Sequence, residues 1–426
     1  MILLVLANIF LQAPKKYVKI LSIMSDILND EEKKEWKNYK RHINIWRLSR
    51  FLAPVYLKAK LGYTYDVAPK TFKPPYIVLS NHNSNFDAVG LGLSFPRHMY
   101  FIASEQVYRS GFKSKLLKWA FEPIAKIKGS TDFLAVAKAL RKIRKGQNIC
   151  LFPEANRSFN GKTYPIQEAT GKLVKVSGGG LITYRFEGEY LSTPRWAKNG
   201  VRKGKVHGRI VHYYTAEELK EMSVSEVTDI IRQDLYEDAY ARQAENPIKY
   251  KGKNRAEGME CAVCVCPECK KIDVIGTHKN TVFCKNCGVS TEYDEYGYFG
   301  DDFKFKTITQ WDEWQTEFYK DYIANFSDET QPLFFDDNVK LSVIGNDHLE
   351  TKIGSGCFKF FKDRIEFNET TILVKDITAV SIFGKCVLCF SDAKGLHYEL
   401  RPENFTDIKN FRKYTSALEI LLGLVG

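Results

Sequence analysis

The apolar residues in the first half of the chain predict a fold that alternates strands and helices. Between residues 76 and 190, short apolar runs alternate with stretches whose apolar positions recur at helical spacing. A strand, a helix and a second strand in that order form a parallel crossover unit, so we expect an α/β core with a mostly parallel sheet. The runs that predict strands are Tyr76–Leu79, Phe95–Ser104, Pro123–Gly129, Asn148–Phe152 and Leu181–Phe186.

From about Val339 the pattern changes to an alternation of apolar and polar residues, which predicts antiparallel β structure. Residues 357–361 and 364–367 are typical of a hairpin, and further short strands follow up to Leu400. Residues 405–422 then have the periodicity of a closing amphipathic helix. Several antiparallel strands followed by one C-terminal helix resemble a pleckstrin-homology domain, although only in topology.

The first sixty residues predict an apolar segment followed by a basic amphipathic helix. Met1–Gln12 is strongly apolar, but twelve helical residues extend only ~18 Å, too short for a hydrocarbon core of about 30 Å. This segment is either a shallow membrane anchor or an upstream extension of a chain that starts at Met24. We expect a helix over Asp30–Phe51, started by caps in residues 25–30 and ended by Pro54.

The apolar residues of this helix recur at helical spacing, with basic residues between them. A helical face that carries tryptophans beside cations suits a lipid headgroup interface. A helix that simply covers its own domain explains the same pattern. The residues of the predicted face are Trp36, Tyr39, Ile43 and Trp46.

The charge of the chain, with 63 basic against 51 acidic residues, is positive and unevenly distributed. Residues 195–211 carry six basic side chains and no acidic one, whereas residues 291–340 are strongly acidic. A basic stretch beside an acidic one favours an anionic surface as partner, either lipid headgroups or nucleic acid. A basic face that is merely solvated is the alternative. The hydrophobic content of 44% is typical of a soluble globular protein.

The run Tyr76–Leu79 stops abruptly in Ser-Asn-His-Asn-Ser-Asn, which is turn and helix-cap chemistry. His82 should therefore lie just past the carboxyl end of a strand, where open α/β sheets bind ligands. Asp87 can reach it only from the first turn of the following helix, with Asn83 or Ser84 as N-cap. This arrangement leaves one imidazole nitrogen free as a general base. A pattern this short also occurs in polar loops without function.

A second motif follows the fourth predicted strand. It reads Phe-Pro-Glu-Ala-Asn-Arg-Ser and contains Glu154 and Arg157. Together, Asn-His-x4-Asp and this later motif resemble the lysophosphatidic acid acyltransferase family of glycerolipid acyltransferases, over about residues 76–190. The family motif is Phe-Pro-Glu-Gly-Thr-Arg-Ser, so this chain departs from it at Ala155 and Asn156.

The resemblance implies an acyltransferase that moves a fatty acyl chain from acyl-CoA or acyl-carrier protein to a lysophospholipid in phospholipid synthesis. The resemblance favours 1-acylglycerol 3-phosphate as the acceptor, and its free hydroxyl would receive the acyl chain. His82 would be the general base, and Asp87 would hold the imidazole tautomer. Arg157, helped by Lys128, would bind the acceptor's phosphate, and Glu154 would orient that loop. Lys128 stands where the family usually has arginine, which keeps the charge but loses the bidentate geometry.

Three other interpretations remain. Ser84, close to His82, would be the nucleophile of a covalent mechanism. A degenerate acyltransferase would act as a lipid-binding protein. A zinc-ribbon protein that binds nucleic acid would use the basic stretch, but it leaves the paired motifs unexplained. We therefore expect an anionic membrane surface rather than nucleic acid as partner, and a cytoplasmic protein peripherally associated with the inner face of the membrane.

The ten cysteines do not suggest a secreted disulfide scaffold, and their Cys-x-x-Cys pairs indicate metal binding in a reducing cytoplasm. Two such pairs separated by fourteen residues predict a zinc ribbon, because two knuckles close a tetrahedral four-cysteine site. Cys261 and Cys264 are an alternative first pair of metal ligands. Cys386 and Cys389 lie in an apolar strand-like run, where residues three apart point to opposite faces. We expect structural zinc, or another thiophilic ion, at Cys266, Cys269, Cys284 and Cys287.

These observations divide the chain into four parts. An N-terminal apolar segment and amphipathic helix occupy residues 1–60, and an acyltransferase domain occupies residues 61–248. A linker and zinc ribbon follow at residues 249–300. A β-rich domain with a closing helix completes the chain at residues 301–426.

Overall fold

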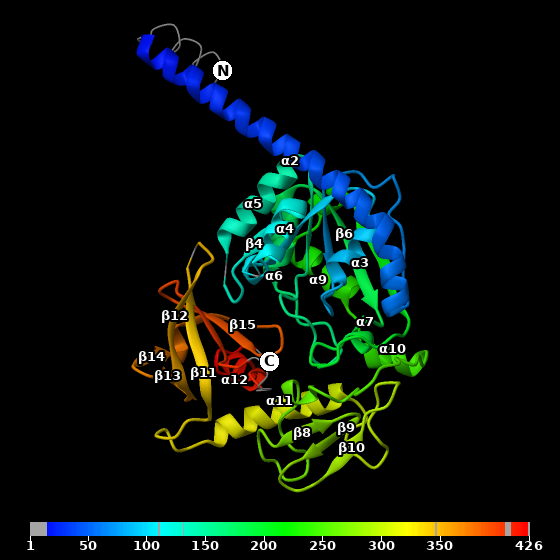
Figure 1. Cartoon of the computed structure of the whole chain (residues 1–426), viewed down its shortest axis with the longest axis vertical. Coiled ribbons are helices and arrows are strands. Elements are labelled where there is room, and N and C mark those ends of the chain that lie inside the picture. The colour runs from blue at the N-terminus through cyan, green and yellow to red at the C-terminus, as the bar shows by residue number, and fades with distance from the viewer. Residues whose placement is uncertain (1–14, 110, 131, 346, 405–409, 425–426) are drawn as a thin grey trace.

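The described residues of the computed structural model form three sheets, and helix α2 projects past the first of them at one end of the molecule (Figure 1). The predicted apolar segment Met1–Gln12 lies outside the described residues. The structure describes residues 15–109, 111–130, 132–345, 347–404 and 410–424.

The N-terminal helix is longer than the sequence predicted. Helix α2 (Lys15–Leu61) passes through Pro54, so both predicted ends, the caps before residue 30 and the stop at Pro54, are wrong. A proline removes one backbone donor, but Leu57 and Leu61 beyond it are fully buried, and this packing keeps the chain helical. Tertiary contacts therefore outweigh the helix-breaking tendency of one residue.

The predicted tryptophan face of this helix is also wrong. Trp36 is 56% exposed, whereas Trp46 is 4% exposed and donates a hydrogen bond of 2.9 Å to the carbonyl of Phe95. Ten helical residues turn through about 1000°, so the two rings point in different directions. Tyr39 stacks against Tyr100 of the sheet. This part of α2 covers its own domain, which is the simpler of the two interpretations.

The core is a seven-stranded sheet with the strand order β1-β7-β6-β2-β5-β3-β4. The strands from β6 to β4 are parallel to one another, as predicted, while β7 runs antiparallel to β6 and pairs in parallel with β1. The bounds are β1 (Tyr63–Tyr65), β2 (Tyr76–Ser80), β3 (Met99–Ser104), β4 (Ile124–Lys126), β5 (Asn148–Leu151), β6 (Gly180–Glu187) and β7 (Val206–Tyr214).

Helices cover both faces of this sheet, so its central strands are buried on both sides. On β2, Val78 belongs to the apolar cluster beneath α2 and α3, while Ile77 and Leu79 belong to the cluster beneath α5, α6 and α9. A capping box of Ser223 and Glu226 starts α9. The helices are α3 (Asp87–Ser94), α4 (Phe112–Phe121), α5 (Phe133–Arg144), α6 (Glu168–Ser177), α7 (Glu189–Ser192), α8 (Ala216–Glu221), α9 (Val224–Leu235) and α10 (Ala239–Glu245), with the 3-10 helix η1 (Glu105–Tyr108).

A small antiparallel sheet follows, and then a second seven-stranded sheet, also antiparallel (Figure 1). The alternating pattern after Val339 therefore predicted its structure correctly, whereas the pleckstrin-homology topology stays a prediction. The small sheet consists of β8 (Ile275–His278), β9 (Thr281–Cys284) and β10 (Ser290–Glu292), preceded by η2 (Met259–Cys261) and followed by α11 (Ile308–Asn325). The second sheet consists of β11 (Phe334–Ile344), β12 (Glu350–Phe360), β13 (Arg364–Phe367), β14 (Thr370–Leu373), β15 (Ile377–Phe383), β16 (Val387–Asp392) and β17 (His397–Pro402), with η3 (Val374–Asp376) and the closing α12 (Arg412–Leu421).

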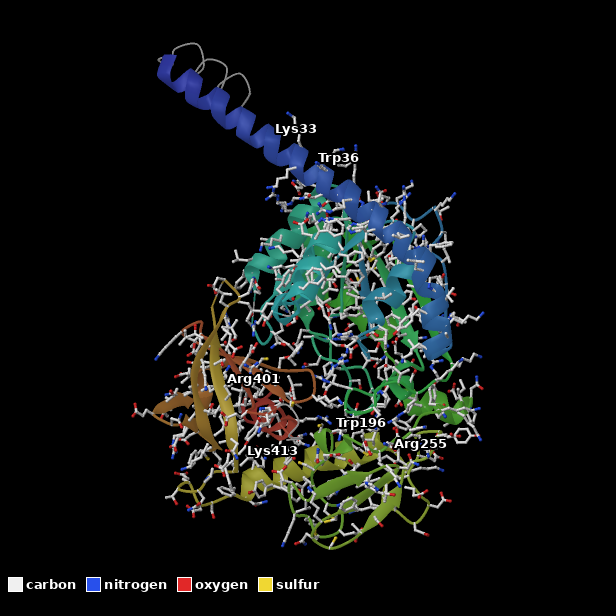
Figure 2. The ribbon with its side chains drawn as sticks, in the orientation of Figure 1. Lys33, Trp36, Trp196, Arg255, Arg401 and Lys413 are labelled. Carbon is white, nitrogen blue, oxygen red and sulfur yellow. The ribbon has the colours of Figure 1, made fainter. Side chains whose placement is uncertain are left out.

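One apolar cluster joins the small sheet, the second sheet and part of the α/β region. Phe159 and Trp196 enter it from the α/β region, Val265 from the segment before β8, and Trp311 and Leu418 from α11 and α12. Figure 2 places Trp196 and Arg255 where the α/β region meets the small sheet. Residues distant in sequence therefore share one core.

The basic stretch of residues 195–211 does not form a single exposed patch, contrary to the interpretation of its charge. Arg195 and Arg202 are buried. Arg202 lies over the rings of Trp196 and Tyr293, where its planar guanidinium packs by cation–π contact. Lys198, Lys203 and Lys205 are exposed.

Candidate active site

The two sequence motifs meet at one edge of the sheet. Strand β2 pairs in parallel with β5, with Leu79 opposite Leu151, so the loops that follow both strands leave the sheet side by side. The backbone N–H of Ser158 donates to the carbonyl of His82 at 3.2 Å. Arg157 therefore emerges at the same sheet edge as His82.

His82 and Asp87 form a hydrogen-bonded pair. His82 lies in the loop after β2, Asp87 is the first residue of α3, and Nδ1 lies 2.6 Å from Oδ2. The predicted cap is wrong, because Phe86 is the N-cap and uses no side-chain bond. Instead the Asp87 carboxylate accepts the backbone N–H groups of Asn83 and Ser84 at 2.7 and 3.0 Å. The carboxylate that orients the imidazole also closes the loop.

The surroundings of this pair favour different charge states for its two members. Asp87 is 0% exposed and the His82 side chain 26% exposed. Burial lowers the pKa of His82 more than the bond to Asp87 raises it, and Arg157 and Lys128 lower it further. Burial would raise the pKa of Asp87, but the bonds from His82 and Ser84 outweigh it and hold that pKa below its usual value. The favoured state is therefore neutral His82 beside ionised Asp87, with Nδ1–H toward the carboxylate and Nε2 as acceptor.

Glu154 supports the backbone of His82. Its Oε1 accepts the His82 N–H at 2.6 Å and its Oε2 accepts the Tyr164 N–H at 2.6 Å. Burial raises the pKa of Glu154 to about 8, although these two bonds oppose the shift. Phe152 of the same motif stacks on the His82 ring, with centroids 4.4 Å apart. The second motif thus holds the first in place.

Arg157 and Lys128 lie close to this pair. Arg157 Nη1 donates to Asn85 Oδ1 at 3.1 Å, and Lys128 Nζ donates to the carbonyl of Ala155 at 2.5 Å. Burial, and then the charge of Arg195, lowers the pKa of Lys128 to about 7. Two cations next to a neutral imidazole form a site that suits an anionic group.

A family model described as "Acyltransferase" matches residues 62–184, a range that includes both motifs. Residues 62–184 are an acyltransferase domain. Among solved structures, the chain is similar to the 1-acyl-sn-glycerophosphate (LPA) acyltransferase PlsC from Thermotoga maritima, with 18% sequence identity and a TM-score of 0.36. That match covers 54% of this chain and 89% of the other. No curated protein matches the chain.

Three residues of the candidate site were not singled out from the sequence. The Asn81 side chain bonds the backbone of Phe186 at 2.7 and 3.0 Å and so ties the His82 loop to β6. Glu189 contacts Ser84 from α7. Arg195 donates to the carbonyl of Arg157. Asn81 had a signal, since it precedes His82 in the motif, but the other two lie far from both motifs in sequence.

Ser84 is not placed as a nucleophile. Its hydroxyl is buried and lies 2.7 Å from Asp87 Oδ1 and 2.5 Å from Glu189 Oε1. The imidazole of His82 is bonded to Asp87 and not to this hydroxyl. A serine nucleophile needs a base within hydrogen-bond reach of its hydroxyl, so this geometry does not fit a serine activated by His82.

The four predicted cysteine ligands converge. Sγ of Cys266 lies 3.6 Å from that of Cys287, and Sγ of Cys269 lies 3.8 Å from that of Cys284. All four sulfur atoms lie within 4.8 Å of one another. A tetrahedral zinc ion with bonds of ~2.3 Å separates its sulfur ligands by about 3.8 Å, so the thiols fit such an ion. Within the part of the chain that the structure describes, no other group of this kind is found.

The cysteines of the other two Cys-x-x-Cys pairs lie outside this cluster. Sγ of Cys264 lies 2.8 Å from the Tyr319 hydroxyl in the core, and Cys261 is buried. Cys389 is buried on β16 and faces Gln106, while Cys386 precedes that strand and is half-buried. Neither pair contributes to the four-cysteine cluster.

Over residues 15–109, 111–130, 132–345, 347–404 and 410–424, no helix is both long and apolar enough to cross a bilayer.

Proposed function

We propose that this protein transfers a fatty acyl chain from acyl-CoA or acyl-carrier protein to the free hydroxyl of a lysophospholipid, with 1-acylglycerol 3-phosphate as the first acceptor to test. The observation that carries the proposal is the 2.6 Å bond between His82 and Asp87 inside an acyltransferase domain. It provides an oriented base at the edge of the sheet where ligands bind.

In the proposed reaction, His82 Nε2 takes the proton of the acceptor hydroxyl while its oxygen attacks the thioester carbonyl. A new ester bond forms, and the carbon–sulfur bond breaks to release a thiolate. The thiol has a pKa of about 8.5, so the thiolate leaves readily and takes back the proton held on His82. Asp87 stabilises the transient imidazolium and keeps Nδ1–H in place. No covalent enzyme intermediate is required.

The acceptor's phosphate would bind between Arg157 and Lys128. Arginine can contact two phosphate oxygens at once, and a bound dianion would raise the pKa of Lys128 and keep it charged. Arg157 is half-buried, so the contact would be partly shielded from water. Glu154 would act through the loop, since its oxygens are occupied by backbone N–H groups.

We also propose that the protein is cytoplasmic and associates peripherally with the inner face of the membrane. Helix α2 exposes an apolar stripe at helical spacing that includes Phe51 and Val55, which are 79% and 74% exposed. Arg41 of α2 lies over the Trp119 ring of α4, so α4 is its neighbour. Helix α4 adds exposed apolar residues between exposed lysines. The apolar residues are Leu48, Phe51, Leu52, Val55 and Tyr56 on α2, and Phe112, Leu116 and Trp119 on α4.

The four-cysteine cluster would hold a structural zinc ion. Four thiolates complete a tetrahedral shell, so Cys266, Cys269, Cys284 and Cys287 leave no position for substrate. The ion would tie the segment before β8 to the end of β9, and the proposed transfer does not use it.

The decisive test is purified protein with acyl-CoA and a panel of lysolipids, followed by thiol release and lipid product. Transfer to lysophosphatidate that depends on His82 is the expected result. Acyl-CoA that stays intact with every acceptor would contradict the proposal and favour the lipid-binding alternative. Salt-dependent DNA binding without thioester consumption would instead favour the nucleic-acid alternative.

A further inference from the structure

A second carboxyl group lies behind the His82–Asp87 pair. Glu189 is the first residue of α7, it is buried, and its Oε1 lies 2.5 Å from the hydroxyl of Ser84. Its other oxygen, Oε2, is buried without a hydrogen-bond partner among the described residues. Nothing in the proposed transfer uses this group.

The Ser84 hydroxyl allows the protons in this cluster to be counted. Its oxygen accepts the N–H of Phe86 at 2.9 Å and lies close to two carboxyl oxygens, at 2.7 Å from Asp87 and 2.5 Å from Glu189. A hydroxyl has one hydrogen and can donate it to only one of them. The other carboxyl group must therefore carry a proton and donate it to the serine.

The surroundings decide which carboxyl group is protonated. Asp87 accepts three further hydrogen bonds, from the His82 ring and from the backbone N–H groups of Asn83 and Ser84. These donors favour its ionised form. Glu189 has no such donors, and one of its oxygens has no hydrogen-bond partner among the described residues. A buried carboxyl group with so few partners is more stable as the neutral acid. Burial, and then Asp87, raises the pKa of Glu189 well above its usual value.

We propose that neutral Glu189, acting through Ser84, is a positioning residue for the Asp87–His82 pair. Its proton is donated to Ser84, and the Ser84 proton is donated to Asp87 Oδ1. This second bond spreads the charge of Asp87 and weakens its pull on the His82 proton, so that His82 stays neutral and ready to act as base. The consequence for catalysis rests on the proposed function, whereas the proton placement does not.

Other titratable and charged groups also face this cluster and influence the pKa values of its members. Tyr63 of β1 and Tyr184 of β6 lie near Glu189, and Cys150 of β5 lies near Asp87. Around His82 the charged or titratable groups are Asp87, Arg157, Lys128 and Glu154. None of these groups is changed in the variants below, so a shift in His82 reports on the Glu189–Ser84 chain.

The test compares Glu189→Gln with Glu189→Leu. Glutamine keeps the shape and supplies an N–H donor to Ser84, whereas leucine keeps the volume and supplies none. NMR titration of labelled histidine gives the pKa of His82 directly, without any need for turnover. We expect glutamine to leave it unchanged and leucine to raise it by a few tenths of a pH unit, because a Ser84 hydroxyl with no donor behind it is a weaker donor to Asp87.

Ser84→Ala provides an independent arm, since it breaks the chain while Glu189 remains. It should raise the pKa of His82 by about one pH unit, more than leucine does, because the bond from the Ser84 hydroxyl to charged Asp87 is lost, and adding Glu189→Leu should have no further effect. The infrared carbonyl band of protonated carboxylic acids should be smaller in Glu189→Gln than in the wild type, while buried Glu154 keeps its contribution to that band. In the thiol-release assay, leucine should lower kcat by no more than about twofold near pH 7 with little change in KM, and shift the acid limb of the pH profile upward.

The possible outcomes separate the protonation of Glu189 from the proposed acyl transfer. A glutamine variant that shifts the pKa of His82 as much as leucine does, or an infrared carbonyl band that is the same in Glu189→Gln as in the wild type, would show that Glu189 is ionised and would overturn the inference. Unchanged His82 titration in both the leucine and the Ser84→Ala variants would overturn it as well. Failure of thiol release with every acceptor would contradict the proposed function and leave the titration result standing.

Discussion

Arg195 donates a hydrogen bond of 2.7 Å from Nη1 to the backbone carbonyl of Arg157. Its remaining nitrogens donate to the carbonyls of Ile382 and Gly384 in the β15–β16 hairpin, at 2.5 and 2.6 Å. One buried guanidinium thus joins the second acyltransferase motif to the C-terminal sheet. Asn156 strengthens the link, since its Oδ1 accepts the hydroxyl of Ser381 at 3.0 Å.

Because of this link, Arg195→Lys tests whether the C-terminal sheet helps to hold the Arg157 loop in place. Lysine keeps the charge but cannot donate to three carbonyls in fixed directions, so the Arg157 loop should loosen. We expect KM for the phosphate-bearing acceptor to rise about tenfold, with a smaller change in kcat. Lys205→Ala removes an exposed charge from the same basic stretch and should have little effect. Equal losses in both variants would mean that the effect is not specific to the link made by Arg195.

His82→Ala should lower turnover by ~10²–10⁴, the usual contribution of a positioned base, with unchanged folding. Asp87→Asn should also be severely impaired, because it favours the wrong imidazole tautomer. Thiol release measures the first effect, and circular dichroism with thermal unfolding checks the fold. Near-normal release by a well-folded His82→Ala protein would contradict the mechanism.

Arg157→Ala should mainly weaken the use of an acceptor with a phosphomonoester, because the charge-assisted contact is lost. A loss of about tenfold to a hundredfold in kcat/KM is expected for lysophosphatidate. A lysolipid without an exposed phosphomonoester is the matched substrate and should be affected less. Equal losses on both acceptors would assign Arg157 to the structure of the loop.

Stability should fall in mild acid because of two buried histidines between α2 and β3. Burial, with Arg41 and Lys142, lowers the pKa of His42 to about 4, and burial, with His42, lowers the pKa of His98 to about 3. Both values lie below the ordinary 6.5, so the unfolded chain binds more protons in acid. The stabilisation is complete above about pH 6.5 and is lost as the pH falls toward 4, by at most about 1.4 kcal/mol per histidine and pH unit.

Urea unfolding between about pH 7.5 and about pH 5 measures this slope. His98→Phe should flatten it, since both ring nitrogens of His98 lack hydrogen-bond partners among the described residues and phenylalanine keeps the packing. His278→Ala, at an exposed position, should leave the slope unchanged. A slope that is the same in all three proteins would assign the acid effect to other groups.

Cys284→Ser should lose bound metal and loosen the segment from about residue 261 to 292, because metal binding at such sites contributes local folding free energy. Activity on detergent-dispersed substrate should fall only modestly. Metal content, limited proteolysis and thiol release on one preparation measure the three effects. Cys386→Ser, outside the cluster, is the control. Abolished turnover with a protease-resistant core would couple the metal to the active site.

Val55→Glu should weaken binding to anionic liposomes roughly tenfold, because it places a charge on the exposed apolar stripe of α2. Cosedimentation at low and high salt separates the apolar from the lysine contribution. Leu349→Glu changes an exposed apolar residue of the C-terminal part and is the control. Equal binding by all three proteins would remove α2 from the proposed membrane contact.

The sequence by itself determined the features whose causes are local. The apolar pattern and the turn residues predicted β2 and β5, the loop position of His82 and the place of Asp87 in the first turn of the next helix. Each of these depends on residues within one turn or strand. The four cysteines were also predictable, since the spacing within each knuckle directs two thiols to one point.

Only the tertiary structure decided the rest. Arg195 reaches Ile382 across 187 positions, and no periodicity encodes such a contact. Glu189 acts on Asp87 because β6 delivers it beside Ser84, a proximity set by strand order rather than by spacing. Helix α2 continues past Pro54 because buried side chains further along outweigh one missing backbone hydrogen bond. Burial of Arg195 likewise turned an apparent surface charge into an internal link, and burial is a property of the whole fold.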